Sequence, residues 1–430
     1  MKKKANEKTG EVSRRDFIKA SAAVSLAAMG VGTNRIYAAG SGKIRVGLIG
    51  CGGRGNGALS NCLSAGEHIG REMEVVATAD WFKDRAVGAG KKHEVPEERC
   101  FYGADAYKKL LKTNVDVVCI ATSPNFRPVH FEAAVKAGKH VFMEKPVAVD
   151  PPGGRKIIEA GELAKEKGLG VVAGTQRRHQ RGYRRNAYAI KHGAIGKILG
   201  GCVWWCGGAL WYRRQNENES DADYLVRNWV SFAGMSGDHI VEQHVHNIDV
   251  INWFSESRPV KAVAFGSRQR RVTGDQYDFF STDFEYENGI HVHSMCRQIN
   301  GCINNVSEYI RGTEGYSNCC NTIYNPDGSV KWQYNYPKDD QGQPTDSVKV
   351  SPYDQEHIDL VTAIRENKPY TEAENTAIST MSAIMGRISA YTGSEVSWEE
   401  LMGSSLKLGP AVYQWGPVDI DKTVPVPGSE

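Results

Sequence analysis

The stretch KIRVGLIGCGGRG, residues 43–55, decides the fold. A short apolar strand runs directly into glycines spaced as G-x-G-x-x-G. The first glycine permits a tight turn, the second lets the backbone approach a pyrophosphate, and the third lets the next helix pack closely. The N-terminus of that helix then faces the phosphates. The stretch predicts a dinucleotide-binding turn whose contact residues are Gly50, Gly52, Gly53, Arg54 and Gly55.

A second apolar strand, 73–80, ends in an acidic residue, Asp80. A carboxylate at this place can accept hydrogen bonds from the adenine ribose hydroxyls and repel a 2′-phosphate. We therefore expect NAD as the cofactor, while Lys83 and Arg85 nearby leave NADP open. The alternative for Asp80 is the N-cap of the following helix.

Strands and helices continue to alternate, with further apolar strands at 115–121, 140–143 and 169–173. This alternation predicts a parallel sheet flanked by helices in residues 40–176. Polar residues follow the carboxyl ends of these strands, where a cofactor binds. The further candidates for cofactor contacts are Thr122, Ser123, Asn125, His130, Glu144, Lys145 and Gln176.

The order of these motifs resembles the Gfo/Idh/MocA family of oxidoreductases. The resemblance rests on the glycine turn, Asp80, Thr122-Ser123-Pro124-Asn125 with His130, Glu144-Lys145-Pro146, Gly174–Arg178, Glu242–Asp249 and Gly312–Gly315, and spans nearly all of the mature chain. It implies hydride transfer between a nicotinamide and a secondary hydroxyl of a sugar, glycoside or cyclitol. It also implies that Lys145 is the general acid/base of the reaction.

A second group of candidates lies in residues 238–253, which we expect to form a helix. Glu242, His246 and Asp249 are spaced i, i+4 and i+7, which places them on one helix face. In the family an Asp and, four residues later, a His complete the proton-transfer set. His246 takes the His position, whereas Glu242 replaces the Asp.

The basic run 177–185 follows the last predicted strand and is in part a solvated surface. Its first members lie where cofactor and substrate meet in the family. The candidate substrate-binding residues are Arg177, His179, Tyr183 and Asp249. The pairs His244/His246 and His291/His293 raise metal binding as an alternative, but we expect no metal.

After residue 196 the pattern changes to β-strands, expected at 198–206, 260–270, 279–286, 290–297 and 306–311, with a hairpin turn at 287–289. Residues 177–430 are predicted to form an α+β domain with a large open, mostly antiparallel sheet. We expect a surface loop at 323–351, helices at 357–366 and 373–393, and an extended tail at 408–430. The resemblance implies that the outer sheet face mediates homo-oligomerisation.

The first 39 residues read as a twin-arginine export signal. Ser13-Arg14-Arg15-Asp16-Phe17-Ile18-Lys19 precedes a short apolar stretch and small residues near Ala38. We therefore expect a periplasmic or otherwise exported protein that meets the export machinery and has no membrane span after cleavage. Because an exported protein cannot draw on cytosolic nucleotide, the cofactor should be held tightly.

The net charge of the chain gives no reason to expect a polyanionic partner. The chain has 53 basic and 50 acidic side chains, and the signal holds eight and three of these, so the mature chain has a net charge of −2. Nucleic acid is therefore not expected as a partner. Ten cysteines without a C-x-x-C pair favour free thiols.

Two other functions remain open at this stage. Exported relatives include redox-neutral glycoside hydrolases, which oxidise a ring carbon transiently and cleave by elimination. Export with a closed cofactor cycle favours this alternative, whereas retention of Lys145 favours a dehydrogenase. A non-catalytic nucleotide-binding regulator is the third possibility and would require loss of the proton-transfer residues, which are present.

Overall fold

The computed structural model describes residues 42–343, 350–409, 418, 420 and 422–428. Ser41–Glu430 forms one compact unit, and the fold is given for its described residues. The predicted signal, 1–39, lies outside them, as does most of the predicted extended tail. None of the described helices combines the length and the apolar composition that a membrane crossing requires.

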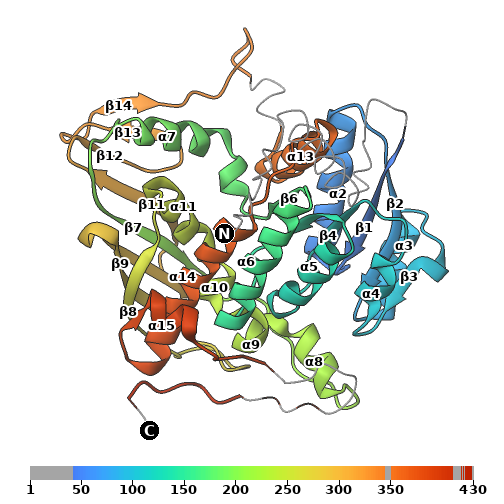
Figure 1. Ribbon diagram of the computed structural model, residues 1–430. Helices are drawn as coiled ribbons and strands as arrows, with labels where there is room; N and C mark the ends of the chain where they lie inside the picture. Colours follow the sequence, from blue (N-terminus) through green and yellow to red (C-terminus); the bar gives the residue numbers. More distant parts are fainter. Residues whose placement is uncertain (1–41, 344–349, 410–417, 419, 421, 429–430) are drawn as a thin grey trace, which may run out of the picture. The chain divides into compact units, whose positions relative to one another are not determined.

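The first sheet has six parallel strands in the order β3-β2-β1-β4-β5-β6 (Figure 1). The strands are β1 (Ile44–Ile49), β2 (Met73–Asp80), β3 (Cys100–Tyr102), β4 (Val117–Ile120), β5 (His140–Met143) and β6 (Val171–Ala173). Their apolar runs are buried almost throughout, as expected for a sheet covered on both faces. Because the strand order reverses between β1 and β4, a crevice forms at the carboxyl ends of these two strands.

The helices that connect these strands are α2 (Gly53–His68), α3 (Lys83–Lys92), α4 (Ala106–Leu111), α5 (Arg127–Lys136) and α6 (Pro151–Glu166). Two glycines make the turn into α2 possible. Gly50 has a left-handed backbone, with φ of 94°. A Cβ atom on Gly55 would lie 1.8 Å from the carbonyl oxygen of Gly50. The glycine turn between β1 and α2 is thus as predicted.

The second sheet has nine strands in the order β14-β13-β12-β11-β7-β10-β9-β8-β15. They are β7 (Ile198–Gly207), β8 (Pro259–Ser267), β9 (Phe279–Tyr286), β10 (His291–Gln298), β11 (Asn305–Gly312), β12 (Gly315–Ser317), β13 (Thr322–Tyr324), β14 (Val330–Gln333) and β15 (Val396–Ser397). Only β7 and β10 pair in parallel, which confirms a mostly antiparallel sheet. The loop predicted from residue 323 is wrong in part, because it contains β14 and most of β13.

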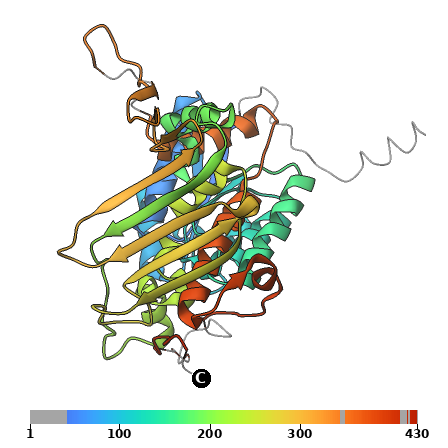
Figure 2. The same ribbon diagram turned by 90° about the vertical axis from the view of Figure 1, so that its left-hand side faces the viewer.

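The remaining helices are α7 (Arg181–Lys191), α8 (Asp221–Arg227), α9 (Ala233–Ser236), α10 (His239–Glu242), α11 (Val245–Ser255), α13 (Pro352–Arg365), α14 (Ala373–Thr392) and α15 (Trp398–Gly403). Helices α11 and α14 pack on one face of the second sheet. The other face is turned to the viewer in Figure 2, with no described helix in front of it. Along β8, Ala262 and Ala264 are buried while Val263 and Phe265 point outward, the alternation of a half-covered sheet.

The last two long helices return to the first sheet. Helix α13 packs on α2 and α14 packs on α6. Helices are predicted in both places, but α13 begins five residues before its predicted start at 357. Elements from both halves of the chain therefore meet around the first sheet. The domain boundary placed after residue 176 stays a prediction.

Candidate cofactor and active site

A cavity of about 430 Å³ opens at the carboxyl ends of β1, β2 and β4. This is the switch point of the first sheet, where doubly wound folds bind their ligands. The lining includes nine of the predicted cofactor-binding residues: Gly50, Gly52, Gly53, Arg54, Gly55, Asp80, Thr122, Ser123 and His130. The glycine turn therefore leaves space for a ligand at the place where the pyrophosphate of a dinucleotide is expected.

Asp80 fixes the shape of the glycine turn. Its Oδ2 accepts a hydrogen bond from the backbone N–H of Cys51 at 2.7 Å, and its Oδ1 accepts one from that of Phe82 at 2.9 Å. Burial raises the pKa of this carboxyl, and the two backbone hydrogen bonds oppose that effect. The N-cap of α3 is Phe82, so the alternative interpretation of Asp80 as a helix cap is wrong.

His130 forms part of the cavity wall as a neutral ring. Its Nδ1 lies 3.2 Å from the Thr122 hydroxyl, and its ring lies 4.4 Å from that of Tyr107. Burial lowers the pKa of His130 to about 3. Next to it, Asn125 accepts a hydrogen bond from Ser123 at 3.0 Å and does not itself line the cavity.

One wall of the cavity comes from residues 208–232, which we call the arm. Its contribution consists of Trp211, Arg213, Val226, Arg227 and Trp229. The arm is tied to the end of β2, because Trp81 Nε1 donates a hydrogen bond to Asp223 Oδ1 at 2.6 Å. The Arg227 guanidinium also lies 4.0 Å from the ring centre of Phe82. Nothing in the spacing of the sequence predicts this wall, although its tryptophans and arginines are a compositional signal.

Arg54 connects the glycine turn to the end of β5. Its Nε donates a hydrogen bond to the Glu144 carboxylate, and a terminal nitrogen lies 3.6 Å from Glu356. The other Glu144 oxygen accepts the backbone N–H of Lys145 at 3.2 Å. Glu144 thus holds the segment that carries Lys145, and it does not line the cavity itself.

Lys145 reaches across to the second half of the chain. Its Nζ donates a hydrogen bond to the Glu242 carbonyl oxygen at 2.6 Å and lies 3.4 Å from the Glu242 carboxylate. Both side chains are mostly covered, at 13% and 14% exposure. The Lys145–Pro146 peptide bond is cis, and Arg127, which sequence reasoning missed, donates to the Pro146 carbonyl.

His246 lies in the same region as a buried, neutral imidazole. Its ring stacks on Trp205 with 5.7 Å between ring centres. Burial, followed by the charges of Lys145 and Arg177, lowers the pKa of His246 well below its usual value. A ring that carries no proton on one nitrogen can accept a hydrogen bond from a substrate hydroxyl.

The predicted continuous helix through Glu242 and Asp249 is wrong. Helix α10 ends at Glu242 and α11 begins at Val245. The two residues between them are bound to β10: Gln298 donates to Gln243 at 2.7 Å, and His244 lies 2.7 Å from the Ser294 hydroxyl. These tertiary contacts interrupt a segment whose spacing is helical.

Arg177 also lies against Trp205. Its guanidinium donates to Glu308 at 2.6 Å and lies 5.7 Å from the Trp205 ring centre. Tyr183 donates to the second Glu308 oxygen at 2.9 Å. Glu308 was not predicted, and it orients Arg177 through an ion pair from the sheet. Tyr183 is buried behind that pair.

The other predicted substrate residues are held in separate buried ion pairs. Arg178 binds Asp249 with both carboxylate oxygens, at 2.8 and 2.9 Å. His179 lies 2.7 Å from Asp359 and 3.3 Å from Glu372. The structure does not bring Asp249 or His179 into contact with Lys145. Gln176, a predicted cofactor contact, has a buried Oε1 with no hydrogen-bond partner among the described residues.

The two histidine pairs considered as metal ligands do not converge. His291 lies 2.7 Å from Asp283, and His293 lies 2.9 Å from Ser281. His244 is bound to Ser294 and His246 is stacked on Trp205. Within the described ranges, the one group of three potential ligands that can meet at a point lies elsewhere, in the core of the first sheet.

A doubly wound sheet with a glycine turn, followed by a large open sheet and with a lysine between them, is the arrangement of a dinucleotide-binding oxidoreductase. Comparison with known families agrees. Residues 44–175 match the oxidoreductase family model GFO_IDH_MocA, NAD-binding Rossmann fold, and residues 183–317 match the GFO/IDH/MocA C-terminal domain. The chain belongs to this Gfo/Idh/MocA family. Residues 11–30 match the twin-arginine translocation signal, so the chain carries an export signal.

Among curated relatives, an inositol 2-dehydrogenase of Pseudomonas savastanoi pv. phaseolicola is 32% identical over 159 residues, 36% of this chain and 44% of the relative. The chain spans about half the length of the curated relatives that it matches. Aldose-aldose oxidoreductase from Caulobacter crescentus has the same fold, with a TM-score of 0.63 at 15% identity over 83% of this chain and all of that one. Scyllo-inositol dehydrogenase from Lactobacillus casei also has this fold, with a TM-score of 0.60 at 19% identity over 83% of this chain and 98% of that one.

Proposed function

We propose that this chain transfers a hydride between a tightly bound NAD(H) and a secondary hydroxyl of a sugar, glycoside or cyclitol. The observation that carries the proposal is the meeting of Lys145 and Glu242, 2.6 Å apart at Nζ and the carbonyl oxygen, beside the neutral ring of His246. The cavity at the switch point holds the dinucleotide. The relatives named inositol 2-dehydrogenase support a polyol as the substrate class.

When bound, the nicotinamide supplies the acceptor or donor of the hydride. The protein has to move the hydroxyl proton. In the oxidising direction, the carbinol carbon loses its hydride, the amine of Lys145 in its unprotonated form takes the hydroxyl proton, and a carbonyl remains. His246 accepts a hydrogen bond from the reacting or neighbouring hydroxyl, and the Glu242 carboxylate holds the ammonium that forms. Trp205 and Arg177 complete the surface on which the ring rests.

The cofactor is NAD rather than NADP on this proposal. Asp80 presents its carboxylate to the cavity and is kept there by two backbone N–H groups. A 2′-phosphate beside this carboxylate would meet like charge. Arg85 and Arg227 also line the cavity and are the residues that would favour NADP instead.

The arm provides the physical basis for tight binding. It closes the cavity with Trp211 and Trp229, whose rings can cover an adenine. A cofactor enclosed in this way dissociates only when the arm moves. Tight retention suits a chain that carries an export signal, because the nucleotide must leave the cytoplasm with it.

The open face of the second sheet supports a homo-oligomer. Neighbouring strands carry Val263, Phe265, Met295 and Trp204 on the face that no described helix covers, and Phe265 is 67% exposed. Apolar surface of this kind marks an interface. Light scattering on the mature protein should give a dimer or larger assembly, and Phe265→Lys should lower its mass. A monomeric wild type would contradict this part of the proposal.

The function is tested by purifying the mature protein and measuring bound nucleotide after denaturation. Cyclitols, aldoses and aryl glycosides are then added in turn while reduced nicotinamide is followed by absorbance. A lasting rise with a cyclitol or sugar supports the dehydrogenase. Cleavage of an aryl glycoside without a net change in the nicotinamide would instead establish the redox-neutral hydrolase.

A further inference from the structure

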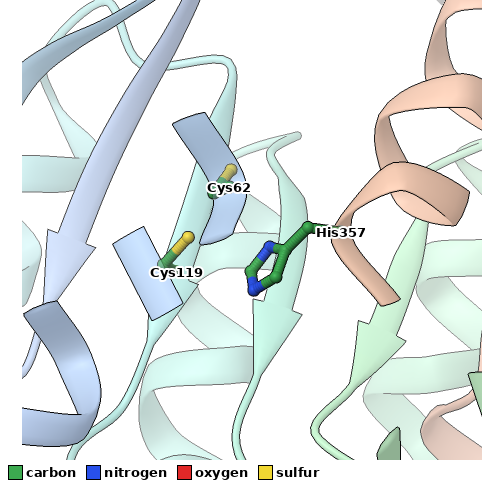
Figure 3. Close-up of side chains that lie close together, drawn as sticks. All are labelled: Cys62, Cys119 and His357. Carbon is green, nitrogen blue, oxygen red and sulfur yellow. The ribbon is translucent and has the colours of Figure 1, made fainter. Parts of the chain in front are cut away.

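Three side chains with metal-binding chemistry meet in the core of the first sheet, outside the lining of the cofactor cavity. Cys62 comes from α2, Cys119 from β4 and His357 from α13 (Figure 3). Their ligand atoms, two sulfurs and one ring nitrogen, all lie within 4.8 Å of one another. All three residues are fully buried.

His357 is the residue that packing alone does not explain. Neither of its ring nitrogens has a hydrogen-bond partner at bonding distance among the described residues. Its ring packs on Phe142 with 4.0 Å between ring centres, so one face is satisfied by an apolar contact. An imidazole carries a donor and an acceptor, and burying both without partners costs stability. A nitrogen of His357 is therefore available as a ligand, and both sulfurs lie within 4.8 Å of it.

We propose that Cys62, Cys119 and His357 form a buried site for a soft metal ion, Zn²⁺ or Cu⁺. Thiolates select these ions, and imidazole suits both. Metal–sulfur bonds of about 2.3 Å and metal–nitrogen bonds of about 2.1 Å need only a small contraction of the present cluster. Two thiolates and a neutral imidazole around Zn²⁺ have no net charge, which favours burial. Cu⁺ is satisfied by the three ligands that the protein supplies.

A disulfide between the two cysteines fits the cluster less well. It would use both sulfurs and leave both nitrogens of His357 without a partner. A metal ion uses all three groups at once. The ion would also join α2, β4 and α13, and so fasten α13 to the sheet that carries the glycine turn.

None of the three residues lines the cofactor cavity, so we expect the ion to act on stability. Cys62 lies nine residues after the first residue of α2, roughly 14 Å along the helix axis from the end that faces the cofactor. The proposal does not depend on the proposed function. Its tests therefore need no substrate.

The experiment starts from the mature full chain, expressed with zinc or copper and freed of loosely held metal. We expect one ion per chain by elemental analysis, and sulfur-to-metal absorption bands when Co²⁺ replaces Zn²⁺. Separate titrations with Zn²⁺, and with Cu⁺ under reducing conditions, identify which ion binds more tightly and raises the melting temperature. Cys62→Ala and Cys119→Ala should each lower the affinity for the metal ion by about 100-fold or more. Residues that only support a metal ligand contribute about 10- to 100-fold, and a ligand should contribute more. Cys100→Ala, a buried thiol outside the cluster, is the matched control and should keep the ion.

Because a variant can fail to fold, the metal content and the Co²⁺ spectrum of the wild type decide the question by themselves. Two results would overturn the proposal. One is a protein without metal in which mass spectrometry finds Cys62 joined to Cys119. The other is a protein that takes up neither ion and whose thiols are both free after denaturation.

Discussion

At the scale of single residues, the proposed reaction needs a neutral imidazole at His246. Burial, and after it the charges of Lys145 and Arg177, hold the pKa of His246 well below the usual value. The ring is therefore available as an acceptor at neutral pH and stays so in mildly acidic solution. The proton of the reaction goes to the lysine.

Replacing His246 by Asn should reduce kcat by about 10²- to 10⁴-fold, the usual contribution of a positioned proton-transfer group. Bound nucleotide should stay at the wild-type level, because His246 does not line the cofactor cavity. In the wild type, the pH–rate profile should show no step near pH 6.5 from this residue. The exposed His192, changed to Asn, is the control. Unchanged turnover in the His246 variant would remove it from the mechanism.

At the scale of elements, the arm adds one wall to the cavity at the switch point. The hydrogen bond from Trp81 to Asp223 and the contact of Arg227 with Phe82 link it to the end of β2, and the apolar cluster behind it includes Leu225 and Phe232. The arm is anchored near the adenosine side of the cavity and not at Lys145. Its loss should therefore affect retention of the cofactor more than chemistry.

Asp223→Ala should weaken nucleotide binding by roughly tenfold, because a hydrogen bond to a charged group contributes about 1.5 to 3 kcal/mol. Dissociation is followed by diluting the loaded protein and measuring nucleotide in the filtrate. The exposed Glu217 of the same arm, changed to Ala, is the control. If the two variants release nucleotide at the same rate as the wild type, the arm does not retain the cofactor.

Elements with a strong local pattern could be predicted, and elements that depend on distant contacts could not. Strands β2 and β9 begin and end at the predicted residues, since an apolar run and a clear alternation mark them. The break between α10 and α11 could not be predicted, because it follows from contacts with β10. The glycine turn and Lys145 were found because each is a local motif. Glu308 could not be found in this way, because it reaches the site only through the sheet.

At the scale of the whole molecule, buried neutral histidines make stability depend on pH. Burial lowers the pKa of His130 and of His244 to about 3, and that of His140 to about 4. In the unfolded chain these rings take up a proton near pH 6.5. Their contribution to the free energy of unfolding is therefore complete above pH 6.5 and is lost as the pH falls towards their pKa values in the folded protein.

The free energy of unfolding should fall by about 1.4 kcal/mol per pH unit for each such histidine between pH 6 and pH 4.5. Denaturant titrations across this range measure the slope. His244→Gln should flatten it by the share of one histidine, while the exposed His192→Gln should leave it unchanged. A slope that is the same in all three proteins would show that His244 is not buried in its neutral form.

The central claim is that Lys145 exchanges the hydroxyl proton at a nicotinamide held in the switch-point cavity. The most direct measurement is a single turnover of nucleotide-loaded Lys145→Met beside the wild type, with the best cyclitol or sugar of the panel. We predict equal nucleotide content and a rate of nicotinamide reduction lower by about 10²-fold or more. Full-rate reduction by the variant, or a wild type that binds no nucleotide, would contradict the account.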